Sequence, residues 1–183
     1  MESPPIVERV GEAFELGERL TVEGRRLEPG ETAPVYELDV LDTATGAIGH
    51  ERLSDTAGLV RLLNVVNSLD TTVCAIETRR FEAARADLPD EIVVLTISMD
   101  LPYAQARWNA EAGVTHRALS AHREEAFGRA YGTLIREWRL LQRAVFVIDR
   151  RDRLVHVEYV ADQMAQPDYD AALAAARAAT GAA

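Results

Sequence analysis

Two apolar segments on either side of a helical one constrain the fold of this chain more than any other feature. Leu59–Val66 and Ile92–Ser98 are nearly continuous apolar runs, and such runs are typical of strands buried on both faces of a parallel sheet. Between them, Ala75–Arg85 has the composition of a helix. A strand, a helix and a second strand in this order form a βαβ unit. The sequence therefore predicts an α/β protein built around parallel strands.

The segment before this unit is predicted to be rich in β-structure. We expect a hairpin of Phe14–Leu16 and Arg19–Val22, with Gly17–Glu18 as its two-residue turn. Val35–Val40 alternates apolar and acidic residues, as a half-buried strand does. A short extended piece is expected near Ile48.

The segment after the unit is predicted to mix helices and strands. Pro102 suits the first turn of a helix that runs to Ala112 and ends at Gly113. The further elements expected, in chain order, are a weaker strand at Val114–Leu119, a helix at Arg123–Tyr131, a hairpin of Ala144–Asp149 and Leu154–Val160, and a helix at Tyr169–Thr180.

The size and composition of the chain favour one soluble globular unit. Its 183 residues are 48% hydrophobic, which is enough apolar material for a core. No internal repeat or linker is visible, so we expect a single domain over residues 1–183, with residues 1–12 flexible. Met1–Pro5 lacks the basic and apolar regions of a secretion signal, and one cysteine cannot form an intrachain disulfide. Both features predict a cytoplasmic protein.

Charge and residue usage exclude several classes of function. The net charge of −10 opposes generic binding to nucleic acid or to an anionic membrane. All 20 basic residues are arginine, so neither Schiff-base chemistry on a lysine nor a phosphate-binding P-loop lysine is available. The four histidines show no metal-binding spacing and the glycines form no phosphate-binding loop, so we expect no metal and no cofactor.

Cys74 is the residue on which reactive chemistry would depend. It lies where Ser68–Val73 leads into the predicted helix. The unpaired N–H groups and the positive dipole end of a helix N-terminus favour an anion, and the thiolate is the reactive form of cysteine. A lone cysteine is also often a small buried hydrophobe. The spacing alone leaves both interpretations open.

The residues around Cys74 resemble the active-site motif of the thiol peroxidases, a subfamily of the peroxiredoxins. Further similar segments are 98–105, 126–132, 143–149 and 167–173. The resemblance extends from about Leu20 to the C-terminus and implies a thioredoxin-like fold, with a central mixed sheet flanked by helices and an N-terminal β-hairpin. The residues that match the motif are Ser68, Asp70, Thr71, Val73, Cys74, Ala75, Arg79 and Phe81.

The same resemblance implies a site for peroxide reduction. Cys74 would be the nucleophile that is oxidised by hydrogen peroxide or an alkyl hydroperoxide. Thr71, about one helical turn earlier, would direct its hydroxyl at the sulfur and the peroxide. Arg143 matches the family's active-site arginine and would stabilise the thiolate and the developing oxyanion. Without the family pattern, Thr71 would be an ordinary helix cap and Arg143 a surface residue at a strand end.

Two positions depart from the family pattern. Asn109 stands where thiol peroxidases commonly carry a resolving cysteine, so turnover would need an external thiol, either a thioredoxin-like protein or a small thiol. Asn67 stands where the pattern has a proline that shapes the loop. These departures keep an alternative open, in which the chain is a non-enzymatic redox sensor or interaction module that forms mixed disulfides. The family also implies a homodimer.

Overall fold

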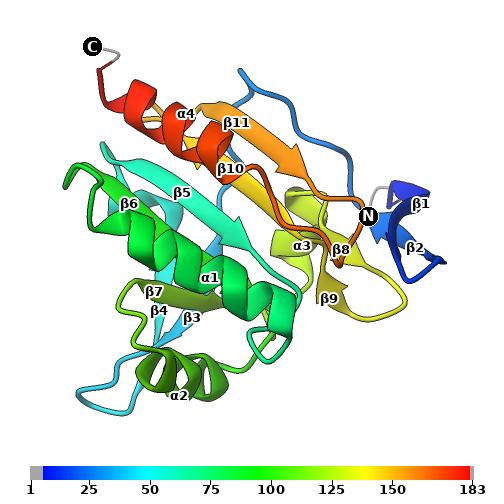
Figure 1. Ribbon diagram of the computed structural model, residues 1–183, viewed down its shortest axis with the longest axis horizontal. Helices are drawn as coiled ribbons and strands as arrows, with labels where there is room; N and C mark the ends of the chain where they lie inside the picture. Colours follow the sequence, from blue (N-terminus) through cyan, green and yellow to red (C-terminus); the bar gives the residue numbers. More distant parts are fainter. Residues whose placement is uncertain (1–5, 182–183) are drawn as a thin grey trace, which may run out of the picture.

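The structure is a computed structural model that describes residues 6–181. Within this range a mixed seven-stranded sheet forms the centre of the protein, in the order β11-β10-β5-β6-β7-β3-β4 (Figure 1). The strands of this sheet are β3 (Glu37–Leu41), β4 (Ile48–Arg52), β5 (Val60–Val65), β6 (Ile92–Ser98), β7 (Arg117–Ser120), β10 (Ala144–Ile148) and β11 (Leu154–Tyr159). A short 3₁₀ turn, η1 (Leu53–Thr56), follows β4.

The predicted βαβ unit is confirmed. β5 and β6 pair in parallel, and α1 (Thr72–Arg85) connects them. All six residues of β5 are buried, which explains why its sequence shows no alternation. β7 extends the parallel part of the sheet beside β6, and α2 (Pro102–Ala112) joins these two strands. Gly113 ends α2 in the left-handed conformation, with φ of 68°.

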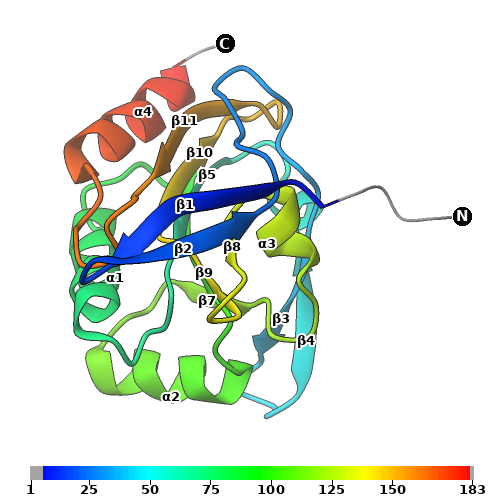
Figure 2. The same ribbon diagram turned by 90° about the vertical axis from the view of Figure 1, so that its right-hand side faces the viewer.

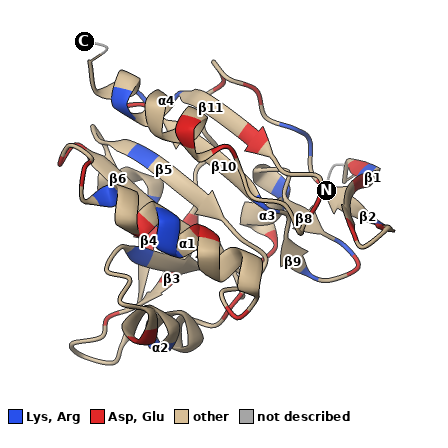
Figure 3. Cartoon of the chain, viewed as in Figure 1, with Lys and Arg blue, Asp and Glu red and all other residues tan. Residues whose placement is uncertain are grey.

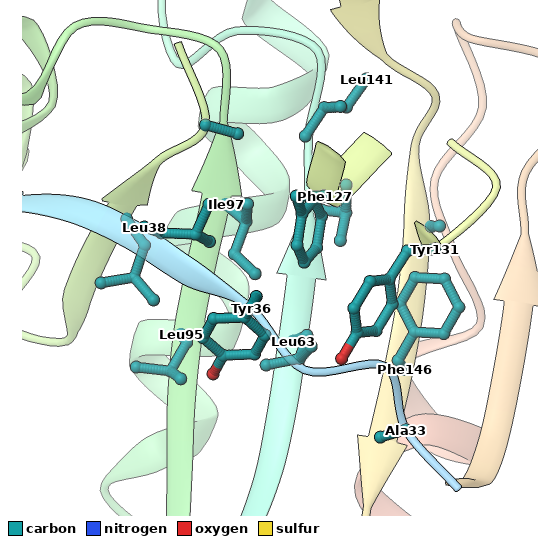
Figure 4. Close-up of a cluster of buried hydrophobic side chains, with 14 of the residues drawn as sticks. Ala33, Tyr36, Leu38, Leu63, Leu95, Ile97, Phe127, Tyr131, Leu141 and Phe146 are labelled. Carbon is teal, nitrogen blue, oxygen red and sulfur yellow. The ribbon is translucent and has the colours of Figure 1, made fainter. Parts of the chain in front are cut away.

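Helices and loops cover both faces of the sheet. On one face, α1 and α4 (Tyr169–Gly181) lie side by side over β5, β6 and β10 (Figure 1). On the other face, α3 (Ala126–Ala130) and its flanking loops contribute Phe127 and Tyr131, which pack onto Leu63 and Phe146 (Figure 4). The thioredoxin-like prediction of a mixed sheet between helices therefore holds.

The N-terminal hairpin belongs to a second sheet that the sequence did not reveal. β1 (Glu8–Glu15) and β2 (Glu18–Glu23) pair with β8 (Leu134–Ile135) and β9 (Leu140–Leu141) in the order β1-β2-β8-β9. Figure 2 shows this small sheet lying across one side of the central one. Strands of two residues are too short to produce a detectable alternation, which is why β8 and β9 were not predicted.

Several predicted boundaries need correction. The turn of the first hairpin is Leu16–Gly17 rather than Gly17–Glu18, because Glu15 pairs with Glu18 and the two turn residues have φ of 48° and 89°. The predicted strand at 35–40 begins two residues later, because its pairing with β4 starts at Glu37, opposite Arg52. The predicted helix at 123–131 is shorter: α3 covers only Ala126–Ala130, and Arg123 lies in the turn before it, where it forms an ion pair with Asp39 of β3.

Other sequence expectations concern the chain ends and the surface. Of residues 1–12, expected to be flexible, 8–12 belong to β1 and 1–5 lie outside the described residues. Acidic and basic residues are distributed over helices, strands and loops (Figure 3). Among the described residues, no helix has the length and apolar character needed to span a membrane.

Phe81→Ala is expected to lower the free energy of unfolding by about 3–5 kcal/mol, the usual cost of removing a buried aromatic ring. Phe81 is fully buried, and its ring lies 5.1 Å from that of Tyr169, so it joins α1 to α4 and the sheet. Urea unfolding followed by circular dichroism measures the change. Ile76→Ala, on the exposed side of α1, is the control and should change stability by about 0.5 kcal/mol or less. Equal losses in the two variants would contradict this packing.

Candidate active site

Cys74 lies in the first turn of α1, and a carboxylate after β6 holds the loop that precedes it. Asp100 accepts hydrogen bonds from the Ser68 hydroxyl at 2.6 Å and from the Leu69 N–H at 2.8 Å. β5 and β6 are parallel neighbours, so the loops that follow them emerge at the same sheet edge. This contact fixes the point at which α1 begins.

The sulfur is closed off from water in this structure. Cys74 is 0% exposed and clusters with Val66 and Leu69, with the ring of Trp108 packed against them. The sequence left open whether Cys74 is a reactive cysteine or a small buried side chain, and the structure shows that it is buried. The surroundings are not purely apolar, however, since an arginine and an asparagine contact the sulfur.

Arg143 provides the positive charge. Its Nη2 lies 3.5 Å from Cys74 Sγ and donates to the Gln163 carbonyl at 2.9 Å, while Nη1 donates to Glu77. The side chain is 0% exposed, so the alternative of a surface arginine at a strand end is wrong. β10 pairs antiparallel with β5, with Ala144 opposite Val65, and this register brings residue 143 to the end of β5 from which the Cys74 loop leaves.

The ion pair between Arg143 and Glu77 is completely buried. Burial raises the pKa of Glu77 to about 7, and the neighbouring Arg143 limits that rise. Burial also acts to lower the pKa of Arg143, but Glu77 and Cys74 outweigh it and the pKa lies above its ordinary value. The guanidinium therefore remains charged beside the sulfur.

Thr71 is not joined to the other two predicted residues in this structure. It occupies the N-cap position of α1 with extended backbone angles, but its side chain makes no capping hydrogen bond. Its hydroxyl instead donates to the Ser68 carbonyl at 3.0 Å, and the residue is exposed. The structure thus brings Cys74 and Arg143 together, whereas Thr71 lies exposed at the N-cap of α1.

The two asparagines that depart from the family pattern differ in position. Asn67 is buried, and its Oδ1 lies 3.9 Å from Cys74 Sγ. Asn109 lies on α2, where its Nδ2 donates to the His116 carbonyl at 3.1 Å. Asn67 is therefore part of the sulfur's immediate surroundings.

Two further residues of the site were missed. Glu77 follows Cys74 by three residues on α1, and that spacing alone places the two on one helix face. Gln163 is 1% exposed and accepts a hydrogen bond from the Arg143 N–H at 3.0 Å. No local pattern marks Gln163, because it reaches the site only through the packing of the segment after β11. Among residues 6–181, no group of three or more His, Cys, Asp or Glu side chains is arranged to hold a metal ion.

Comparisons with known proteins agree on one family. The Redoxin family profile matches residues 28–173. The chain is 44% identical over 164 residues to a thiol peroxidase of Halalkalibacterium halodurans, covering 89% of this chain and 95% of the relative. It is 39% identical over 163 residues to a thiol peroxidase of Bacillus subtilis, covering 88% and 94%.

Solved structures share the fold. A peroxiredoxin-like protein from Aquifex aeolicus superposes with a TM-score of 0.82 at 27% identity, over 94% of this chain and 98% of that one. A thiol peroxidase from Chromobacterium violaceum has a TM-score of 0.77 at 22% identity, over 87% and 91% of the two chains. At 22% identity, the similarity to the Chromobacterium violaceum protein shows a shared fold only.

Glu77→Gln is expected to flatten the dependence of stability on pH between about 4.5 and about 7. Over that range the folded wild-type chain keeps a proton on Glu77 that the unfolded chain has released, so its free energy of unfolding falls as pH rises. Glutamine removes this contribution. Urea unfolding at a series of pH values measures the slope.

Glu111→Gln, at an exposed glutamate of α2, is the matched control and should keep the wild-type slope. Identical slopes in the wild type and in Glu77→Gln would show that the carboxyl of Glu77 ionises as it does in the unfolded chain.

Proposed function

The chain belongs to the thiol peroxidases of the Redoxin family, and we propose that it reduces hydrogen peroxide or alkyl hydroperoxides through Cys74 with an external thiol as reductant. The observation that carries this proposal is the contact between the Cys74 sulfur and the buried Arg143 guanidinium at 3.5 Å. A cation fixed beside a sulfur attracts negative charge on it, and the thiolate is the nucleophilic form of cysteine.

In the oxidative step, the thiolate attacks the outer oxygen of the peroxide. A sulfur–oxygen bond forms, the oxygen–oxygen bond breaks, and water or an alcohol leaves after taking up a proton. Arg143 stabilises the thiolate and the negative charge that develops on the leaving oxygen. Glu77 keeps the guanidinium in place, because Nη1 is bound to it and Nη2 is left to face the sulfur.

Thr71 is proposed to orient the peroxide as it enters. Its hydroxyl is exposed at the start of α1 and donates to Ser68, so its oxygen can accept a hydrogen bond from an incoming hydroperoxide. Because the sulfur is fully buried, peroxide entry requires side chains of the surrounding cluster to move. Thr71 lies on the loop that would move with them.

The reductive step must use thiols from outside this chain. Cys74 is the only cysteine, and Asn109 cannot form a disulfide. An external thiol attacks the sulfur of the sulfenic acid, releasing water and leaving a mixed disulfide. A second thiol attacks the external sulfur of this mixed disulfide, so that a disulfide forms between the two external thiols and Cys74 leaves as a thiol. The chemistry admits a thioredoxin-like protein or a small thiol in these two roles.

We further propose that the protein acts in the cytoplasm as a homodimer of single-domain chains. A single cysteine that must be re-reduced suits a reducing compartment. Leu101 and Tyr103 are 53% and 59% exposed and follow Asp100, the residue that holds the Cys74 loop. Exposed apolar side chains at such a place suit a subunit contact.

The non-enzymatic alternative, a redox sensor or interaction module, is not favoured. The similarity to thiol peroxidases spans nearly the whole length of those relatives, and the arginine expected at the sulfur lies beside it.

Cys74→Ser is expected to abolish peroxide consumption, because the hydroxyl of serine is a far weaker nucleophile than a thiolate. The assay follows loss of hydrogen peroxide with dithiothreitol as the external thiol, and circular dichroism checks the fold. In the wild type, intact-mass analysis after peroxide and a monothiol should show a mixed disulfide on Cys74. Peroxide consumption by Cys74→Ser at the wild-type rate would contradict the proposal.

Arg143→Met is expected to slow the oxidation of Cys74 by hydrogen peroxide about 100-fold or more, since methionine keeps the volume but not the charge. Stopped-flow fluorescence measures the rate constant. The single change leaves the Glu77 carboxylate buried without its partner, so the double variant Glu77→Gln/Arg143→Met separates lost chemistry from lost stability.

The matched control for this experiment is Arg151→Met, at an exposed arginine in the turn between β10 and β11. It should keep the wild-type rate constant. If the folded double variant is oxidised as fast as the wild type, Arg143 has no role in the reaction.

A further inference from the structure

Asn67 gives the sulfur a polar contact opposite in character to that of Arg143. Its side-chain oxygen Oδ1 lies 3.9 Å from Cys74 Sγ, and the residue is 5% exposed. The guanidinium of Arg143 can only donate hydrogen bonds, whereas an amide oxygen can only accept them. The sulfur is therefore bordered by one donor and one acceptor.

The neighbours of Asn67 fix which end of its amide faces the sulfur. Nδ2 donates to the Leu141 carbonyl at 2.5 Å and to Gln163 Oε1 at 3.1 Å. Turning the amide over would place its oxygen against the Leu141 carbonyl, which is an acceptor and offers no proton.

Gln163 is held in its orientation as well. Its Oε1 accepts from the Arg143 N–H at 3.0 Å, and its Nε2 donates to the carbonyls of Val160 and Ala161 at 2.7 and 3.1 Å. The backbone of Arg143 thus orients Gln163, Gln163 orients Asn67, and Asn67 presents its oxygen to the sulfur.

An acceptor in this position stabilises protonated forms of the cysteine and not anionic ones. We propose that Asn67 is a positioning residue that accepts a hydrogen bond from the hydroxyl of the Cys74 sulfenic acid, keeps that acid protonated and slows its further oxidation. The separation of 3.9 Å leaves room for an oxygen bound to sulfur to come within hydrogen-bonding distance of Oδ1. This inference rests on the proposed function.

The reaction that Asn67 opposes is a second attack on peroxide. The sulfenate anion forms another sulfur–oxygen bond, the oxygen–oxygen bond of the peroxide breaks, and a sulfinate and water result, which is an irreversible loss of the cysteine for most proteins. Arg143 favours the sulfenate, and the carboxyl of Glu77 and the phenol of Tyr169 are the other ionisable groups near it. Asn67 is a neutral acceptor, and its contact favours the protonated sulfenic acid over the sulfenate anion.

This protection has a particular use in a chain with one cysteine. With a resolving cysteine, a sulfenic acid is captured within the same protein. Here it persists until an external thiol arrives, and throughout that time a second peroxide can reach it. A hydrogen bond that holds the hydroxyl proton lowers the fraction of the reactive anion.

The test compares the second oxidation in Asn67→Ala and Asn67→Pro with the wild type. Each reduced protein first receives one equivalent of hydrogen peroxide to form the sulfenic acid, and then an excess. Intact-mass analysis over time gives the rate constant for the gain of a second oxygen. Loss of one hydrogen bond predicts an increase of about threefold or more in both variants.

Asn109→Ala removes a similar side-chain hydrogen bond on α2 and should behave as the wild type. If Asn67→Ala destabilises the loop, the rate of second oxidation in Asn67→Pro is compared with the wild type instead, because proline is the residue that the family pattern has at this position.

Unchanged second oxidation in the folded Ala or Pro variant would overturn the inference. The first oxidation is timed separately by stopped flow. If the wild type reacts with peroxide no faster than a free thiol, the proposed function fails, yet the second step is still measured on the preformed sulfenic acid. The two failures are therefore distinguishable.

Discussion

The buried ion pair between Arg143 and Glu77 is the interaction on which the rest of the site depends. A guanidinium that is 0% exposed is tolerated only where its charge and donors are matched. Glu77 supplies the opposite charge, the Gln163 carbonyl accepts a hydrogen bond, and Cys74 is the third partner. Since the first two partners are fixed, the sulfur meets a cation whose direction is already set. The site is thus organised before any substrate arrives.

The way in which α1 is held to the sheet preserves this geometry. Of its buried residues only Phe81 is a large apolar one. The side-chain amide of Asn64, on β5, donates hydrogen bonds to the hydroxyls of Thr78 on α1 and Thr96 on β6. The Thr96 hydroxyl is also hydrogen-bonded to His116, and His116 is hydrogen-bonded to Glu82 of α1. Hydrogen bonds are directional, so such a network fixes the rotation of the helix about its axis more closely than apolar packing would. The distance between the sulfur and Arg143 depends on that rotation.

A closed site strengthens these electrostatic contacts and limits access to them. Exclusion of water raises the effect of one charge on a nearby sulfur, because the local dielectric constant is low. The same packing by Val66, Leu69 and Trp108 keeps peroxide out until side chains move.

Sequence reasoning identified the βαβ core because the pattern of β5, α1 and β6 is local, and it identified Cys74 and Arg143 because both lie in motifs of a known family. It missed β8 and β9, which are too short to show a period, and it missed Gln163, which no motif marks. Residue type and order by themselves determined the parallel core of the central sheet and the presence of one cysteine, with no second thiol in the chain to pair with it. Only the tertiary structure decided how Asn67, Glu77 and Gln163 are arranged around Arg143 and the sulfur. Arg143 lies 69 positions along the chain from Cys74 and Gln163 a further 20, and the pairing of β10 with β5 is what brings them together.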